Sequence, residues 1–122
     1  MAVIAFTQRE FTQNTWTVMY DGSNDFAMTS FSAFNMQTVT PLGIAFAIGD
    51  GTIVTGSNTA FDENSDIVTT NTESILLNDT LSFAQITTWS ADSGKIIIPA
   101  GKQICVAFTG GNAEVGLFGL EL

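Results

Sequence analysis

The stretch "IIIPAGKQICVAF" at residues 96–108 decides the fold class of this chain. Three isoleucines lead into a Pro-Ala-Gly turn, and a second apolar run leaves it. β-branched and aromatic residues on both sides of a Pro/Gly turn are typical of strands that fill a shared core. We therefore expect a hairpin that turns at residues 99–101 and brings five side chains into one core: Ile96, Ile98, Ile104, Val106 and Phe108.

A second segment, "LGIAFAIGDG" at residues 42–51, alternates large and small side chains with a period of two. This period indicates a strand whose two faces differ. The large face consists of Leu42, Ile44, Phe46 and Ile48, and the small face of Gly43, Ala45, Ala47 and Gly49. We expect the large face to enter the core and the small face to let another layer come close.

Similar alternation recurs along the chain, and no long stretch keeps the spacing of an amphipathic helix. Further strands are expected at residues 14–20, 25–36, 67–70, 74–77, 80–88, 95–99, 103–109 and 114–122. In the first of these, Trp16, Val18 and Tyr20 share one face. The second changes phase, as a β-bulge or two-sided burial would produce. Residues 76–81 are interpreted as a turn, and residues 50–66 as a loop with at most one short strand at 52–55.

Short strands about ten residues apart, separated by turn residues, predict an all-β fold. A chain of 122 residues is long enough to bury its own core as one domain. We expect residues 1–122 to form a single β-sandwich domain, jelly-roll-like, with about eight strands.

The charge composition limits the partners. Twelve acidic residues against three basic ones, Arg9, Lys95 and Lys102, give a net charge of −9. Such a chain repels polyphosphate and anionic lipid, so we expect neither nucleic-acid nor membrane binding. Thr, Ser, Asn and Gln supply 39 of the 122 residues, which predicts a surface rich in hydroxyl and amide groups or partly covered by other subunits. The amino-terminal segment does not resemble a signal peptide, which predicts a soluble protein made without a secretion signal.

Catalytic chemistry is not indicated. Cys105 is the only cysteine and the chain has no histidine, so no internal disulfide can form and the thiol lacks the usual activating base. Cys105 is therefore interpreted as an inert core residue. The acids Asp62, Glu63 and Asp66, joined by Asp50, could offer oxygen ligands to calcium. Their spacing favours a solvated acidic loop instead, so no metal or cofactor is expected.

Three aromatic residues, Trp16, Tyr20 and Trp89, could form a platform for stacking sugars. Single aromatic residues on strands are more often core or interface residues. Residues 78–80, Asn-Asp-Thr, match a glycosylation sequon, which has no role without secretion.

The last segment, "AEVGLFGLEL" at residues 113–122, is apolar on both faces. A strand of this kind needs cover on both sides. One face can enter the core, and the simplest cover for the other is a second protomer, although an internal loop could serve. The expected oligomer interface therefore includes Val115, Leu117, Phe118, Leu120 and Leu122.

Three stretches together resemble the small all-β virion proteins of tailed bacteriophages. They are "TWTVMYDGSNDFAMTSFSAFN" at residues 15–35, "LNDTLSF" at 77–83 and "GKIIIPAGKQICVAFTGGNAEVGLFGLEL" at 94–122. The first turn, "DGSND", departs from the Pro-Ala-Gly expected there. The carboxy-terminal pattern is also similar to the trimeric jelly-roll heads of the tumour-necrosis-factor and complement type.

The phage resemblance implies a non-enzymatic building block of a virus particle. It would be made in the host cytoplasm and placed on the outer surface of the capsid as a decoration (cement) protein, or on the tail. Its partners would be the major capsid protein or a tail protein of the same virion, and its own copies as a homotrimer. A carbohydrate- or receptor-binding module on the tail, using the three aromatic residues, is the alternative.

Overall fold

The computed structural model describes residues 2–90 and 96–122, apart from the side chain of Trp89. These residues form nine strands and no helix. The strands are β1 (Ala2–Arg9), β2 (Thr17–Tyr20), β3 (Phe26–Asn35), β4 (Leu42–Gly49), β5 (Thr72–Leu81), β6 (Ile86–Ser90), β7 (Ile96–Ile98), β8 (Gln103–Phe108) and β9 (Ala113–Glu121). No helix in the described ranges is long and apolar enough to span a membrane.

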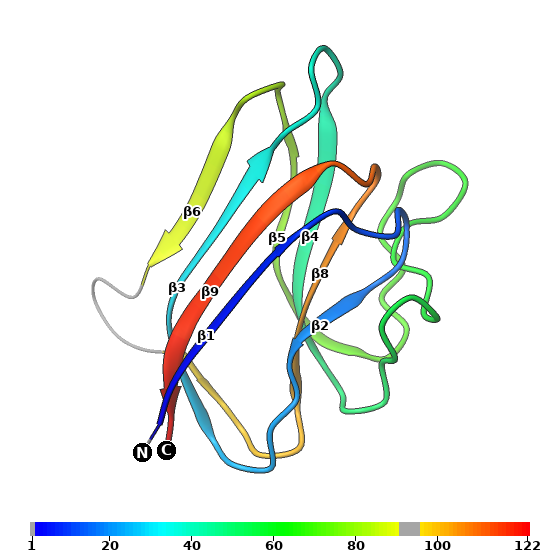
Figure 1. Cartoon of the computed structure of the whole chain (residues 1–122). Coiled ribbons are helices and arrows are strands. Elements are labelled where there is room, and N and C mark those ends of the chain that lie inside the picture. Colours follow the sequence, from blue (N-terminus) through cyan, green and yellow to red (C-terminus); the bar gives the residue numbers. More distant parts are fainter. Residues whose placement is uncertain (1, 91–95) are drawn as a thin grey trace.

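The strands lie in two antiparallel sheets (Figure 1). The first sheet has the order β1-β9-β3-β6, with β7 also pairing with β3, and the second has the order β2-β8-β4-β5. Strands from the first half of the chain thus pair with strands from the second half: β1 with β9, β2 with β8, β3 with β6 and β7, and β4 with β5. This is a long antiparallel ribbon rolled into two layers, the arrangement of a jelly roll. The expected β-sandwich is confirmed, and β6 and β7 together occupy one strand position.

The core lies between the two sheets. The side chains of Ile98, Ile104, Val106 and Phe108 are fully buried there, and Ile96 packs against them, as the opening stretch predicts. The connection itself differs from the prediction. Residues 99–101 join β7 of the first sheet to β8 of the second, so they form an arch between layers and not a hairpin within one sheet. Both geometries point the same side chains inward, so the local pattern could not separate them.

β4 has the two different faces that its alternation predicts. Leu42, Ile44 and Phe46 are buried in the core between the sheets. Ala45 and Ala47 face outward and belong to a second buried cluster. The small face of β4 therefore lies beneath another layer of protein, as expected.

Some expected elements are wrong. Residues 67–70 are not a strand, and residues 76–81, expected to form a turn, belong to β5. Residues 50–66 form a loop as expected, without the short strand allowed for at 52–55. β3 has the predicted irregularity, between Met28 and Ser30. β2 has one that was not predicted, between Val18 and Tyr20. It moves Tyr20 into the core while Trp16 and Val18 remain on the outer side of the sheet.

Candidate interaction surface

The outer face of the second sheet is covered by the chain itself. Ala45, Ala47, Cys105 and Ala107 point outward from β4 and β8, and the segment between β4 and β5 packs on them. Trp16, Ile53, Ala60 and Phe61 are the large and small apolar residues that complete this buried cluster. We call residues 51–70 the covering segment. The covering segment therefore buries the outward side chains of Ala45, Ala47, Cys105 and Ala107.

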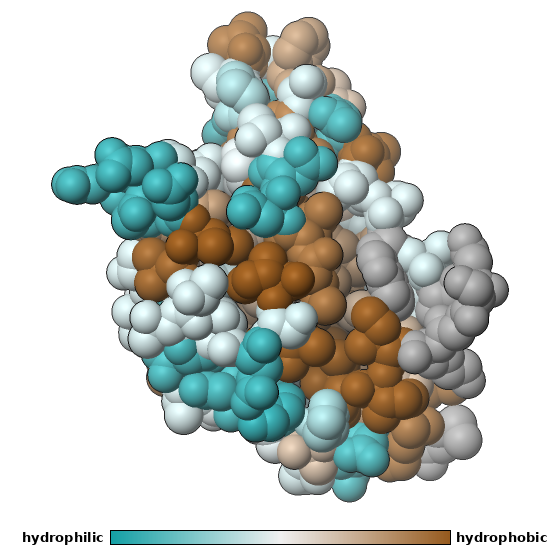
Figure 2. Space-filling view, turned by 180° about the vertical axis from the view of Figure 1, so that it is seen from behind, coloured by the Kyte–Doolittle hydropathy of each residue, from teal (hydrophilic) through white to brown (hydrophobic). Residues whose placement is uncertain are grey.

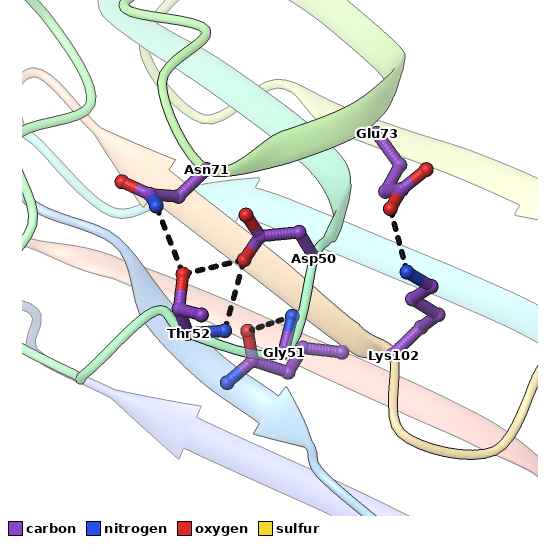
Figure 3. Close-up of polar contacts among 7 residues, drawn as sticks. Asp50, Gly51, Thr52, Asn71, Glu73 and Lys102 are labelled. Atoms are coloured by element: carbon purple, nitrogen blue, oxygen red, sulfur yellow. Dashed lines mark hydrogen bonds and ion pairs between the residues drawn. The ribbon is translucent and has the colours of Figure 1, made fainter.

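A polar network fastens the start and end of the covering segment (Figure 3). The N–H of Asp50 donates to the carbonyl of Asn71 at 2.9 Å, which closes the segment at its base. The Asn71 amide donates to the Thr52 hydroxyl, which donates in turn to the Asp50 carboxylate. The hydroxyl and N–H of Thr52 hold the pKa of Asp50 below its ordinary value. The buried Gln103 accepts from the N–H groups of Gly51 and Ile53 and donates to the carbonyl of Ile53.

The outer face of the first sheet has no such cover within the described residues. In Figure 1 this sheet faces the viewer, and no segment crosses in front of β1 and β9. Residues directly opposite each other in an antiparallel pair point to the same side, so the register of the strand pairs defines the outward set. We call this set the open face: Val3, Ala5, Thr7 and Arg9 of β1, Glu114, Gly116, Phe118 and Leu120 of β9, Ala27, Ser30, Ser32 and Phe34 of β3, Ile86, Thr88 and Ser90 of β6, and Ile97 of β7.

One half of the open face is apolar. The register places Val3 opposite Leu120, Leu120 opposite Ala27, and Ala27 opposite Ile97, so one continuous row crosses four strands. Val3 is 78% exposed and Ile97 46% exposed. Phe118, the next residue along β9 on this side, is 44% exposed. Large apolar side chains that are adjacent and exposed usually mark a contact surface.

The other half of the open face is small and polar toward β1 and apolar toward β6, where Phe34 lies opposite both Glu114 and the 61% exposed Ile86. Thr7, Gly116 and Ser32 form the next row. Beyond them Arg9 pairs with Glu114 at 2.6 Å, with both side chains well exposed. An exposed pair of this kind contributes little to stability. The open face thus combines an apolar contact area with hydroxyl groups and one ion pair.

Figure 2 shows the opposite side of the molecule. The hydrophilic projection at its left corresponds to the turn at residues 62–66, which Figure 1 draws in green at the right. Apolar surface also lies across the middle of this view. Three apolar side chains of β5 are only partly buried and pack against the two clusters: Ile75, Leu76 and Leu77. They contrast with the four strongly exposed apolar residues near the termini: Val3, Ile97, Phe118 and Leu122.

The five residues expected at an oligomer interface divide between two environments. Phe118 and Leu122 are exposed, and Leu120 lies in the apolar row. Val115 and Leu117 are 1% and 0% exposed and lie in the core between the sheets. They are therefore not available to a second protomer, and the expected interface must be reduced to the outward residues of β9.

Of the three aromatic residues considered for a stacking platform, the two whose side chains are described are buried, as the core interpretation predicts. Trp16 is fully buried beneath the covering segment. Tyr20 is buried in the core, where its ring stacks on Phe26 with 4.3 Å between ring centroids. Burial, together with the hydrogen bond and charge of Glu121, raises the pKa of Tyr20 to about 12. The side chain of Trp89 lies outside the described residues.

Cys105 lies fully buried on the outer side of β8, beneath the covering segment. Burial raises the pKa of its thiol to about 12, and the charges of Asp21 and Asp50 act in the same direction. The thiol is therefore protonated and shielded at neutral pH, which agrees with an inert residue.

Two of the acids considered as calcium ligands, Asp62 and Asp50, accept hydrogen bonds from nearby backbone N–H groups. The Asp62 carboxylate accepts the N–H groups of Asn64 and Asp66 at 2.8 and 2.9 Å. Asp50 belongs to the network of Figure 3. In the part of the chain that the structure describes, no three Asp, Glu, Cys or His side chains are grouped so as to hold a metal ion.

Comparisons with known proteins identify no family. No family model matches the chain, and no curated protein does. Among solved structures, a chain of the T13 particle of IBDV matches with 9% identity and a TM-score of 0.44, covering 96% of this chain and 30% of the viral chain. A chain of infectious bursal disease virus, Gx strain, matches with 9% identity and a TM-score of 0.40 over the same shares. These scores are too low to support a functional conclusion, so function must be inferred from the residues of the chain itself.

Proposed function

We propose that this chain is a non-enzymatic structural protein of a virus particle, and that its copies associate through the open face. The observation that carries this proposal is the difference between the two outer faces. The second sheet is covered by residues 51–70 of the same chain, whereas the outward side of the first sheet leaves Val3, Ile97 and Phe118 exposed. A protein that covers one face with its own chain and leaves the other open has a surface suited to a permanent partner.

The finer proposal is a homotrimer that decorates and stabilises a phage capsid. A closed ring hides the open face of every copy, whereas an open contact would continue into filaments. The similarity of residues 15–35 and 94–122 to tailed-phage virion proteins supports the virus setting, and the trimeric jelly-roll heads support three copies. The net charge of −9 suits the outer surface of a shell better than its DNA-filled interior.

The partners in this proposal are the major capsid protein or a tail protein of the same virion, and the protein is made in the host cytoplasm. A non-enzymatic role is supported by the lack of histidine and by the burial of Cys105. Within the described residues, the acids are mostly exposed and lie in turns and on strands at the surface.

The test is the location of the protein in purified virus particles. Particles from infected cells are separated by density and probed with an antibody raised against the chain. We expect the protein in the particle fraction, at a copy number that exceeds that of any tail component. Detection only in the soluble lysate would reject the proposal.

A tail-associated module that binds carbohydrate remains the second candidate, but it needs a different site. One open hollow of about 220 Å³ is lined partly by Pro41, Gly43 and Phe61 and partly by side chains of the kind that bind sugar hydroxyls: Ser65, Asn78, Asp79, Thr80 and Thr109. Binding to a glycan array that is lost in Asp79→Ala, with folding preserved, would favour this function. Glycan binding that survives Asp79→Ala, or its absence, would count against a site in this hollow.

A further inference from the structure

The outermost strand of the first sheet has an unusually uniform free edge. β1 pairs with β9 over all eight of its residues, without any shift of register. In the described structure no other backbone hydrogen bond uses residues of β1. In an antiparallel pair, alternate residues direct their N–H and C=O groups away from the partner. β1 therefore presents a straight row of unpaired backbone groups, about 27 Å long at 3.4 Å per residue.

Natural proteins protect such edges with charges, prolines, bulges or covering loops. β1 has the sequence AVIAFTQR, so its first seven residues contain neither a charge nor a proline. Val3 and Ala5 are exposed on its outward side. A long, regular and apolar edge without these devices is suited to pairing with another strand.

The other edges are protected. β2 has only four residues, and its backbone is engaged by the covering segment, because Val18 donates to the Thr55 hydroxyl and Gly56 donates to Trp16. β5 is interrupted by two shifts of register and carries Glu73 and Asp79. β6 and β7 have five and three residues. Of the four edge positions, only β1 combines length, regularity and the absence of acids.

We propose that β1 pairs with β1 of a second copy of this chain, antiparallel and about a two-fold axis. Charge favours a second copy as the occupant. The molecule carries a net charge of −9, so most contacts between copies bring acids together, but β1 contains no acid and only Arg9 at its end. In an antiparallel pair centred within residues 3–7, the two Arg9 side chains lie at opposite ends. Because each copy uses its single free β1 edge, the contact closes with two copies.

This pairing uses the backbone edge and is independent of the apolar side chains of the open face. A strand pair alone buries less surface than a stable dimer requires, so it is a weak contact that depends on concentration. If the open face also joins three copies, the two contacts together link trimers into a network. A variant blocked on the open face should then stop at the dimer.

Cysteine trapping tests the pairing directly. Val3→Cys, Ala5→Cys and Thr7→Cys are each made in a Phe118→Asn background, which weakens the open face without adding charge. Residues facing their own copy across a two-fold axis lie about 4.5–5.5 Å apart at Cα, within the range of a disulfide. We expect the disulfide-linked dimer to form fastest at whichever of the three positions lies nearest the two-fold axis. The rate of crosslinking should be lower at the other two positions. Val54→Cys, on the covering segment and 60% exposed, is the matched control and should crosslink slowest.

Amide hydrogen exchange provides a second measurement on the Phe118→Asn protein without added cysteines. Raising the protein concentration should slow exchange by about tenfold or more at alternate residues of β1, because only the N–H groups that point away from β9 gain partners. Equal crosslinking at all four cysteines, or exchange in β1 that does not depend on concentration, would overturn the proposal. Neither measurement needs virus particles, so a failure of the proposed virion role would leave this result unaffected.

Discussion

The ring of Phe26 occupies the space that a side chain on Gly119 would need. A Cβ built on Gly119 would lie 2.4 Å from Cζ of Phe26 and 2.5 Å from the carbonyl oxygen of Ala27. Because Phe26 is fully buried and cannot move outward, Gly119→Ala should lower the free energy of unfolding by about 1–3 kcal/mol. Chemical denaturation of the two proteins measures this difference.

Gly116→Ala, three residues earlier on β9 and on the opposite face of the sheet, is the control. Its Cβ would lie 3.3 Å from the Ser32 hydroxyl and 3.4 Å from the Phe118 ring, which a small adjustment of either side chain can accommodate. We expect a change within about 0.5 kcal/mol, as for ordinary surface sites. If both variants lose the same stability, close packing of Phe26 on Gly119 is not the cause.

The side chain of Asn35 forms hydrogen bonds with two loops, at residues 36–41 and 82–85, at the end of the sandwich away from the termini. Its side chain is fully buried, donates to the carbonyls of Thr40, Leu81 and Ser82, and accepts the N–H of Gln37. Asn35→Ala leaves these buried groups without partners, so we expect a loss of about 1–3 kcal/mol in unfolding free energy.

The control for Asn35 is Asn112→Ala. Asn112 is exposed and makes one hydrogen bond, to the carbonyl of Met36 at 3.1 Å. Water can replace that bond, so the variant should unfold at nearly the same denaturant concentration as the wild type. Equal losses in the two variants would contradict a special role for the buried amide.

The alternation of side chains predicted the strands well where both faces are constrained. β4 was predictable because its large and small residues face two different buried layers. The turn expected at 76–81 failed for a physical reason. Asn78 and Asp79 lie in an edge strand with exposed side chains, where their low strand propensity costs little. The actual turn at 82–85 has Ala84 at a positive φ of 56°. It contains no glycine, proline or asparagine from which a turn could be predicted.

The candidate surface was only partly predictable. The alternation of β9 identified Phe118 and Leu120, because the period of two is local information. Val3, Ala27 and Ile97 join them only through the register of four strands that are distant in sequence. No local pattern contains that register. The stacking site failed because the bulge in β2 moved Tyr20 inward and the covering segment buried Trp16.

Stability should depend on Asp50 at acidic pH. Hydrogen bonds from Thr52 and Asn71 and the charge of Lys102 lower the pKa of Asp50 in the folded protein (Figure 3). A lowered folded pKa stabilises the protein above the unfolded pKa, and this contribution is lost as the pH falls through the folded value. The difference in unfolding free energy between wild type and Asp50→Asn should therefore be constant near neutral pH and shrink below the ordinary carboxyl pKa of 3.8. A difference that does not change with pH would contradict this account.

Cys105 should react with thiol reagents only when the protein unfolds. Its thiol is buried and its pKa is raised to about 12, so neither access nor ionisation favours attack. Cys105→Ala should cost on the order of 1 kcal/mol for the lost packing and leave assembly unchanged. Labelling of the native protein is compared with that of Val54→Cys, whose added thiol is exposed and should react at once. Rapid labelling of native Cys105 would show the covering segment to be open in solution.

Substitutions at two neighbouring residues of β9 should distinguish an effect on folding from an effect on assembly. Leu117 points into the core and is 0% exposed, whereas Phe118 points to the open face and is 44% exposed. Leu117→Asp places an unpaired charge in the core and should abolish folding. Phe118→Asp places the charge at the open face, so the chain should keep its far-ultraviolet circular dichroism and its cooperative unfolding but lose association through the open face. Leu120→Asp, in the apolar row, should behave like Phe118→Asp.

Light scattering measures the assembly of these variants. If the open face joins three copies, the wild type has the mass of a trimer at micromolar concentration, and Phe118→Asp has a smaller mass at the same concentration. A charge at this position must be desolvated in every copy of a closed ring, so one substitution acts three times in a trimer. A folded wild-type protein that stays monomeric without a shell would remove the trimer, because the apolar row would then be stable in water. A wild type and a Phe118→Asp protein of equal mass above the monomer would place the contact elsewhere than on the open face.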